Sequence, residues 1–296
     1  MSLRKLTVVL ATLATVSFAL PMGVLYVTQR TLIYYPEKLT REQFLSRVQT
    51  AFHGKASVIP LFDAVVLEPE ATRAAATVIW FHGNAGLNVD RSGVALGLSQ
   101  RGLRLILAEY PGYGARDGEP SESAIVDDAR ALYTSVAARY PESPLLLMGA
   151  SLGSGVAAQL AAKPGYGRAP ARLILLTPYL SIAETAAQRY WMLPVRHLVK
   201  DVFDSAGAIA DYSGPVAILV AGRDEVIGAD QGRLLAERSK ARGPTAYVEL
   251  PLAGHFSWPD LVRSQQWTEL LGVPVSGGHP NEAVEVERTR VVDRSG

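Results

Sequence analysis

The chain has 296 residues, of which 48% are hydrophobic, so it can bury a core of ordinary size. Its 29 lysines and arginines against 28 aspartates and glutamates leave a net charge of +1, which argues against a nucleic-acid partner. The chain has no cysteine, so its fold does not depend on an oxidising compartment. No cluster of His, Asp and Glu has the spacing of metal ligands, and we expect neither a metal nor a cofactor.

The N-terminal segment differs in kind from the rest. After Arg4 and Lys5, residues 6–28 contain no charged residue. At about 1.5 Å per residue, such a helix is long enough to cross a hydrocarbon layer of ~30 Å. We expect residues 1–28 to be a single-pass transmembrane anchor, with the following domain on the non-cytoplasmic side because the two basic residues stay in the cytoplasm. The alternative is a signal peptide cleaved near residues 17–19, which would leave a soluble exported protein.

Residues 29–275 are expected to form one α/β domain. Apolar segments of strand length alternate with helical patterns, which indicates a mostly parallel sheet with helices on both faces. Strands are predicted at residues 61–67, 77–81, 103–108, 145–148, 215–221 and 246–250, and a helix at residues 124–140. The polar tail, residues 276–296, is expected to be disordered.

The loop after the strand at residues 77–81 reads His82-Gly83-Asn84-Ala85-Gly86. Its glycines allow the backbone to turn N–H groups inward, so the N–H of Asn84 is a candidate donor to an oxyanion. His82 follows the strand directly, and we expect it to brace this loop rather than to act in catalysis.

The segment Gly149-Ala150-Ser151-Leu152-Gly153 lies between an apolar strand and a helix of small residues. This is the pattern of a nucleophile elbow, in which strand and helix crowd so closely that the positions two before and two after the serine must be glycine. Ser151 is therefore the predicted nucleophile. The N–H of Leu152 is the second candidate oxyanion donor.

The serine needs a base and an acid, which in α/β-hydrolases follow it in the order Asp or Glu, then His. Asp224 comes just after the strand at residues 215–221, and it is the predicted acid, with Glu225 or Asp230 as substitutes. His255 follows the next strand and is the predicted base, because the later His279 lies in the polar tail. Between these motifs and the elbow, Tyr190, Trp191, Met192 and Leu193 are expected to form the wall of an acyl pocket, or else to pack a surface helix onto the domain.

Seven motifs together resemble the Bem46-type α/β-hydrolases, a group similar to the mammalian ABHD12, ABHD13 and ABHD17 proteins. They are His82-Gly-Asn-Ala-Gly86, Glu109-Tyr-Pro-Gly-Tyr-Gly114, Gly118-Glu-Pro-Ser-Glu122, Gly149-Ala-Ser-Leu-Gly153, Thr177-Pro178, Gly222-Arg-Asp224 and Gly254-His255. The resemblance covers residues 29–272 and implies a serine hydrolase of lipid esters or protein-bound acyl thioesters, often anchored in a membrane. Glu109 and the Ala115-Arg116 step depart from the family pattern, and the lack of cysteine argues against the lipidated ABHD17 type. Residues 29–36 also resemble the start of the family's domain, and they directly follow the uncharged run at residues 6–28. This continuity favours an uncleaved anchor.

The sequence therefore predicts a membrane-anchored serine hydrolase that cleaves acyl esters or thioesters through an acyl-enzyme, using Ser151, His255 and Asp224. Its partners would be an acyl substrate, presented at a membrane surface, and the lipid bilayer itself. Two alternatives remain: a catalytically silent hydrolase-like membrane scaffold, and a serine peptidase.

Overall fold

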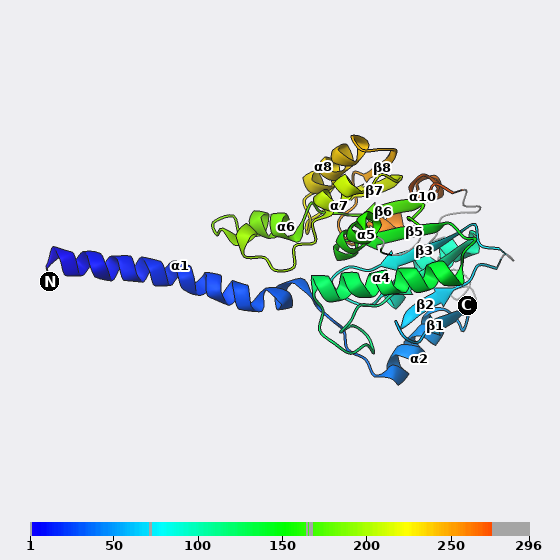
Figure 1. Cartoon of the computed structure of the whole chain (residues 1–296), viewed down its shortest axis with the longest axis horizontal. Helices are drawn as coiled ribbons and strands as arrows, with labels where there is room; N and C mark the ends of the chain where they lie inside the picture. Colours follow the sequence, from blue (N-terminus) through cyan, green and yellow to red (C-terminus); the bar gives the residue numbers. More distant parts are fainter. Residues whose placement is uncertain (1, 71–72, 164, 166–167, 274–296) are drawn as a thin grey trace, which may run out of the picture.

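The computed structural model describes residues 2–70, 73–163, 165 and 168–273. An eight-stranded sheet with the order β1-β2-β4-β3-β5-β6-β7-β8 forms its centre (Figure 1). The first pairings, β1 with β2 and β2 with β4, are antiparallel, and all the others are parallel, so the expected mostly parallel sheet is confirmed. The strands are β1 (Ala56–Ile59), β2 (Ala64–Leu67), β3 (Ala76–Phe81), β4 (Leu103–Ala108), β5 (Leu145–Ala150), β6 (Arg172–Leu176), β7 (Val216–Ala221) and β8 (Thr245–Leu250).

The central strands are covered on both faces. Every residue of β3, β5 and β7 is buried, as expected for parallel strands with helices packed on each side. The predicted strand at residues 61–67 starts three residues late, at Ala64. Residues 60–63 instead form the turn between β1 and β2, where Asp63 takes a positive φ of 48°.

The helices pack in two groups. α4 (Glu122–Arg139), α5 (Leu152–Ala162), α7 (Ser205–Asp211) and α8 (Ala229–Lys240) contact one another in sequence, and α4 crosses in front of the sheet in Figure 1. α3 (Ser92–Gln100) packs on β4 and α10 (Ser264–Leu271) on β6 to β8. The predicted helix at residues 124–140 begins two residues earlier, because the Ser121 hydroxyl accepts the N–H of Ala124 and caps it. The shorter elements are α2 (Arg41–Ala51), η1 (Asn88–Arg91), α6 (Ile182–Arg189), η2 (Val195–His197) and α9 (Trp258–Leu261).

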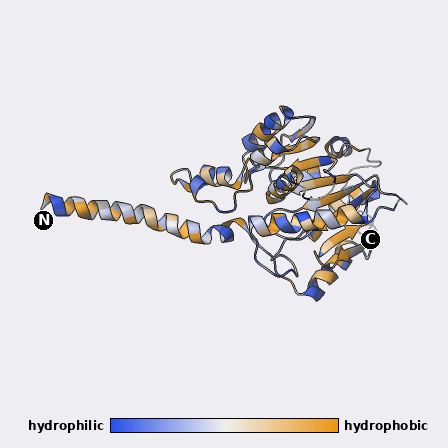
Figure 2. Cartoon of the chain, viewed as in Figure 1, coloured by the Kyte–Doolittle hydropathy of each residue, from blue (hydrophilic) through white to orange (hydrophobic). Residues whose placement is uncertain are grey.

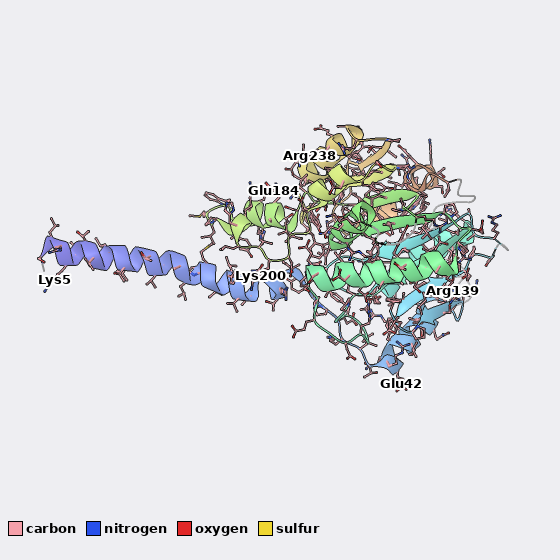
Figure 3. The ribbon with its side chains drawn as sticks, in the orientation of Figure 1. Lys5, Glu42, Arg139, Glu184, Lys200 and Arg238 are labelled. Carbon is pink, nitrogen blue, oxygen red and sulfur yellow. The ribbon has the colours of Figure 1, made fainter. Side chains whose placement is uncertain are left out.

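The first helix, α1 (Leu3–Ile33), extends away from the domain (Figure 1). Lys5 lies at its outer end and Lys200 lies close to the point where it meets the domain (Figure 3). The helix is continuous through residues 28 and 29, where the sequence suggested a domain boundary. The polar tail, residues 276–296, lies outside the described residues.

The expected transmembrane helix is not supported. Among the described residues, no helix is both long enough and apolar enough to cross a membrane. Polar residues recur along α1, and the hydroxyls of Thr7, Thr12 and Thr28 each donate to a backbone carbonyl four residues earlier. Figure 2 shows the resulting mixture of apolar and less apolar residues along this helix.

Candidate active site

Ser151 lies in the sharp turn between β5 and α5. Its backbone takes φ 52° and ψ −121°, a conformation that residues with a side chain rarely adopt. A Cβ at Gly149 would lie 2.0 Å from the carbonyl oxygen of Gly153, and a Cβ at Gly153 would lie 2.2 Å from that of Phe81. Strand and helix thus crowd as the pentapeptide predicts, and no side chain larger than hydrogen fits at either position.

The structure brings Ser151, His255 and Asp224 together at the carboxyl edge of the sheet. Asp224 follows β7 and His255 follows β8, which are parallel neighbours. Nε2 of His255 lies 3.0 Å from Oγ of Ser151, and Nδ1 lies 2.7 Å from Oδ2 of Asp224. The other carboxylate oxygen of Asp224 accepts the N–H groups of Val226 and Ile227 at 2.9 and 2.7 Å. Because both oxygens are engaged and the side chains of Asp224 and His255 are buried, the orientation of the imidazole is fixed.

Glu225, which the sequence left open as a substitute acid, has a different contact. Its carboxylate accepts the backbone N–H of His255 at 3.1 Å. A Cβ at Gly254 would lie 2.8 Å from the same carboxylate, so this glycine allows the approach. Glu225 therefore positions the loop that carries His255. Asp230, the other substitute, lies in the first turn of α8. The sequence contains no signal for the backbone contact of Glu225.

The two predicted oxyanion donors lie beside the nucleophile, since Asn84, Ser151 and Leu152 line the same cavity. Leu152 is the first residue of α5, where a backbone N–H has no acceptor within the helix. The carbonyl of Asn84 accepts the N–H of Tyr35 at 2.9 Å and the hydroxyl of Tyr113 at 2.7 Å. These contacts hold the loop in place against the elbow.

His82 supports the loop at residues 82–86, as expected. Its Nδ1 lies 2.7 Å from the carbonyl oxygen of Gly83, and its Nε2 lies 3.4 Å from the buried carboxylate of Glu109. Tyr110 stacks on the His82 ring at 4.1 Å and donates its hydroxyl to the His82 carbonyl at 2.6 Å. Burial raises the pKa of Tyr110, so its hydroxyl stays protonated and remains a donor. The sequence identified Tyr110 and Tyr113 only as parts of a family motif, not as supports of the oxyanion loop.

The departures from the family pattern are accommodated by local contacts. The guanidinium of Arg116 makes a two-pronged pair with Asp128, with both distances 2.6 Å, and also donates to the backbone carbonyl of Glu109. The Glu109 carboxylate accepts the N–H of Asn88 at 2.7 Å. Arg116 and Glu109 therefore tie the turn after β4 to its neighbours.

A cavity of about 360 Å³ lies beside Ser151. Most of its lining is apolar, and within the described part of the chain no Asp or Glu contributes to it. Of the predicted pocket residues, Tyr190 lines the cavity, whereas Trp191, Met192 and Leu193 do not. Trp191 and Met192 are 78% and 72% exposed, because they lie on a turn beyond the end of α6. The opposite wall comes from the last turns of α1, which the sequence did not predict.

Comparison with known proteins identifies the family of this chain. The family model described as serine aminopeptidase, S33, matches residues 72–208. An uncharacterised protein of Mycobacterium tuberculosis is 32% identical over 242 residues, which cover 77% of this chain and 80% of that protein. The lysophosphatidylserine lipase ABHD12 of Danio rerio is 28% identical over 240 residues, which cover 74% of this chain and 63% of the lipase. The chain belongs to the ABHD12-like α/β-hydrolases.

Solved structures show the same fold for this ABHD12-like hydrolase. The esterase Pf2001 of Pyrococcus furiosus superposes with a TM-score of 0.60 and 15% identity, covering 81% of this chain and 95% of the esterase. Est1E of Butyrivibrio proteoclasticus, solved with ferulic acid bound, gives a TM-score of 0.54 and 17% identity over 66% of this chain and 87% of that enzyme. The α/β-hydrolase fold is thereby confirmed, and the chain is a hydrolase with esterase and lipase relatives.

Proposed function

We propose that this ABHD12-like protein is a serine hydrolase that cleaves acyl esters or thioesters through an acyl-enzyme. The observation that carries the proposal is the hydrogen-bonded series Ser151, His255 and Asp224, whose serine lines a mostly apolar cavity. Esterase and lipase relatives support the choice of an ester substrate.

In the proposed mechanism, His255 Nε2 takes the hydroxyl proton as Ser151 Oγ attacks the acyl carbonyl. The N–H groups of Asn84 and Leu152 donate to the oxyanion of the tetrahedral intermediate. His255 then gives the proton to the departing alkoxide or thiolate, and the acyl group remains on Ser151. A water molecule, deprotonated by the same imidazole, attacks this ester and releases the carboxylic acid, which restores the serine hydroxyl. Asp224 stabilises the imidazolium in each half-reaction.

The lining of the cavity favours an ester over a peptide substrate. An aminopeptidase must bind an ammonium group, for which a buried carboxylate is the suitable partner. Among the described residues that line the cavity, the charged one is Arg189, a cation. The description of the family model favours a peptidase, whereas the lining of the cavity does not.

The location of the protein stays a prediction. We propose that α1 holds the hydrolase domain at the non-cytoplasmic face of a membrane, and the support is the exposed apolar side chains of α1, such as those of Leu13 and Leu20. The hydropathy of the described helices weighs against a complete span. A substrate presented at a membrane surface is the corresponding proposal for the acyl donor.

Replacement of the nucleophile tests the proposed activity. Ser151→Ala should lower kcat on p-nitrophenyl butyrate on the order of 10⁶-fold and abolish labelling by a fluorophosphonate. Ser154→Ala is the matched control, because this buried serine lies three residues away on α5 and its hydroxyl has no partner within the described structure. The control should keep full activity and labelling. A Ser151→Ala protein that still labels stoichiometrically would exclude Ser151, and an unlabelled wild-type protein would favour the silent scaffold.

A further inference from the structure

The last turns of α1 form one wall of the cavity beside Ser151. Leu25, Gln29, Leu32 and Ile33 all line it, together with Tyr26. Positions i, i+4, i+7 and i+8 of a helix lie on one face, so these four side chains form one continuous stripe of α1 that lines the cavity. This stripe is a local feature of the inner end of α1, distinct from the exposed outer part of the helix.

The facing wall comes from the segment between β6 and β7. Ile182, Ala186 and Tyr190 of the α6 region line the cavity, and so do Leu198 and Val199. α6 lies beside the inner half of α1 in Figure 1. The cavity is therefore a slot between two segments far apart in the chain, and Ser151 is one of the residues that line it.

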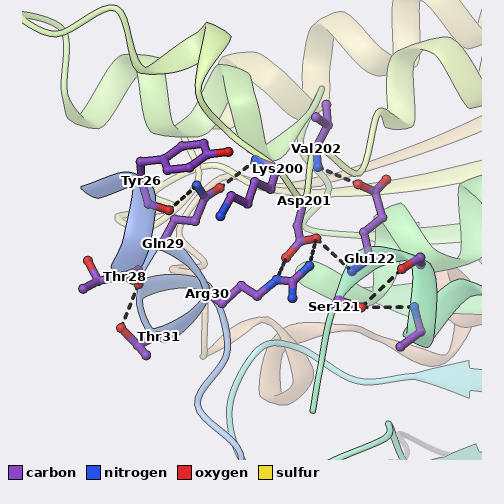
Figure 4. Close-up of polar contacts among 12 residues, drawn as sticks. Tyr26, Thr28, Gln29, Arg30, Thr31, Ser121, Glu122, Lys200, Asp201 and Val202 are labelled. Carbon is purple, nitrogen blue, oxygen red and sulfur yellow. Dashed lines mark hydrogen bonds and ion pairs between the residues drawn. The ribbon is translucent and has the colours of Figure 1, made fainter. Parts of the chain in front are cut away.

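Gln29 joins the two walls. This residue is buried, and its side-chain amide nitrogen donates to the carbonyls of Tyr26 and Leu198 at 2.9 and 3.2 Å. Its amide oxygen accepts the N–H of Lys200 at 2.6 Å (Figure 4). The Lys200 ammonium also lies 3.9 Å from the centre of the Tyr26 ring. One side chain thus fixes the distance between α1 and the facing segment.

A second contact one residue later reinforces this connection. Nε and Nη2 of Arg30 donate to the two carboxylate oxygens of Asp201 at 2.9 and 3.3 Å (Figure 4). The hydrogen bond to Asp201 raises the pKa of the Arg30 guanidinium above its ordinary value. Asp201 is buried and also accepts the N–H of Glu122, whose carboxylate in turn accepts the N–H of Val202 at 2.6 Å. The first turn of α4 therefore takes part in holding α1.

We infer that the inner face of α1 binds the acyl chain of the substrate and determines which chain lengths are accepted. The inference rests on the proposed esterase function, which places the reacting carbonyl at Ser151. An alkyl chain fits this slot because its walls are mostly apolar and lack carboxylates within the described structure, and because Ser151 is one of the residues that line it. The volume lies within the range typical of small-ligand sites. Gln29 and Arg30 are positioning residues that keep the α1 wall in place.

Filling the slot from the α1 side tests this inference. Leu25→Trp should lower kcat/KM for p-nitrophenyl dodecanoate relative to the acetate ester. Each buried methylene contributes about fourfold to affinity. Loss of room for two methylenes should therefore lower the ratio of kcat/KM for the dodecanoate ester to kcat/KM for the acetate ester about fifteenfold. Val27→Trp is the matched control, because Val27 is 76% exposed on the other side of the same helix and is not among the residues that line the slot. The control should keep the wild-type ratio.

A binding measurement separates this inference from the proposed function. In a Ser151→Ala background, fluorescence of cis-parinaric acid reports binding without turnover, and Leu25→Trp should weaken it about tenfold more than Val27→Trp does. Circular dichroism and thermal unfolding establish that each variant is folded. Equal ester ratios and equal parinarate affinities for the two tryptophan variants would overturn the inference. Absence of ester hydrolysis in the wild-type protein, with the difference in parinarate binding preserved, would overturn the proposed function and leave the acyl-binding wall standing.

Discussion

At the scale of single residues, Asp224 is the most fully constrained member of the site. Its carboxylate accepts hydrogen bonds from the backbone N–H groups of Val226 and Ile227 and lies 2.7 Å from Nδ1 of His255. A buried anion with these partners keeps the Nδ1 proton of the imidazole in place, which leaves Nε2 free to accept the proton of Ser151.

Asp224→Asn tests this role of the carboxylate. The amide can present its NH₂ group to Nδ1, which would move the imidazole proton to Nε2 and prevent it from acting as a base. We expect kcat on p-nitrophenyl butyrate to fall about 10⁴-fold while the fold is retained. Asp230→Asn, in the first turn of α8, should remain close to wild type. Near-normal activity of Asp224→Asn, together with loss of activity in Glu225→Gln, would reassign the acid to Glu225.

At the scale of secondary-structure elements, the junction of β3, β5 and α5 determines where the nucleophile lies. α5 starts directly after Ser151, and its second residue, Gly153, packs against the end of β3. This close packing is possible because Gly153 has no side chain. The same close approach brings the loop after β3 against the serine, where a Cβ at Gly83 would lie 3.6 Å from that of Ser151.

Gly153→Ala should therefore destabilise the whole domain. The added methyl group would lie 2.2 Å from the carbonyl oxygen of Phe81, which is backbone and cannot rotate away. We expect urea denaturation to show a loss of about 2 to 3 kcal/mol in the free energy of unfolding. Gly83→Ala is the control, because its methyl group would make only ordinary contacts, and its free energy of unfolding should change by less than about 1 kcal/mol. Equal stabilities of the two variants would mean that α5 can shift away from β3.

Local patterns explain which elements could be predicted from the sequence. Ser151 directly follows one strand, Asp224 and His255 lie three and five residues beyond the ends of two others, and the ends of parallel strands meet at one edge of the sheet. The α1 wall could not be predicted in this way, because Gln29 and Arg30 contact residues about 170 positions later. Apolar character alone also misplaced Trp191 and Met192 in the pocket, since it does not show whether a turn faces a cavity or solvent.

At the scale of the whole molecule, α1 has two parts with different surroundings. Its outer part carries exposed apolar side chains, including Leu13 and Leu20, and its last turns are joined to the domain through Gln29 and Arg30. The predicted boundary at residue 28 falls within α1, and Gln29 and Arg30 lie on the domain side of it. Residues on both sides of this boundary line the cavity beside Ser151.

The fate of α1 in the cell can be measured directly. We expect the protein to keep its original N-terminus, because the turns that line the cavity continue without a break from the outer helix. N-terminal sequencing of the mature protein provides the check. Release into the soluble fraction, with a new N-terminus near Leu20, would identify a cleaved signal peptide and an exported enzyme.

The backbone of Ser151 carries a further consequence, for the balance between stability and activity. Its φ of 52° and ψ of −121° are the mirror image of an ordinary extended conformation, which glycine adopts without strain. Serine at this position is therefore less favourable for folding than glycine would be. The difference in the free energy of unfolding is about 1 kcal/mol, after the greater flexibility of glycine in the unfolded chain is taken into account. Ser151→Gly should be inactive, yet it should melt about 2 to 4 °C above Ser151→Ala. Selection for thermal stability without selection for turnover would thus favour loss of the nucleophile.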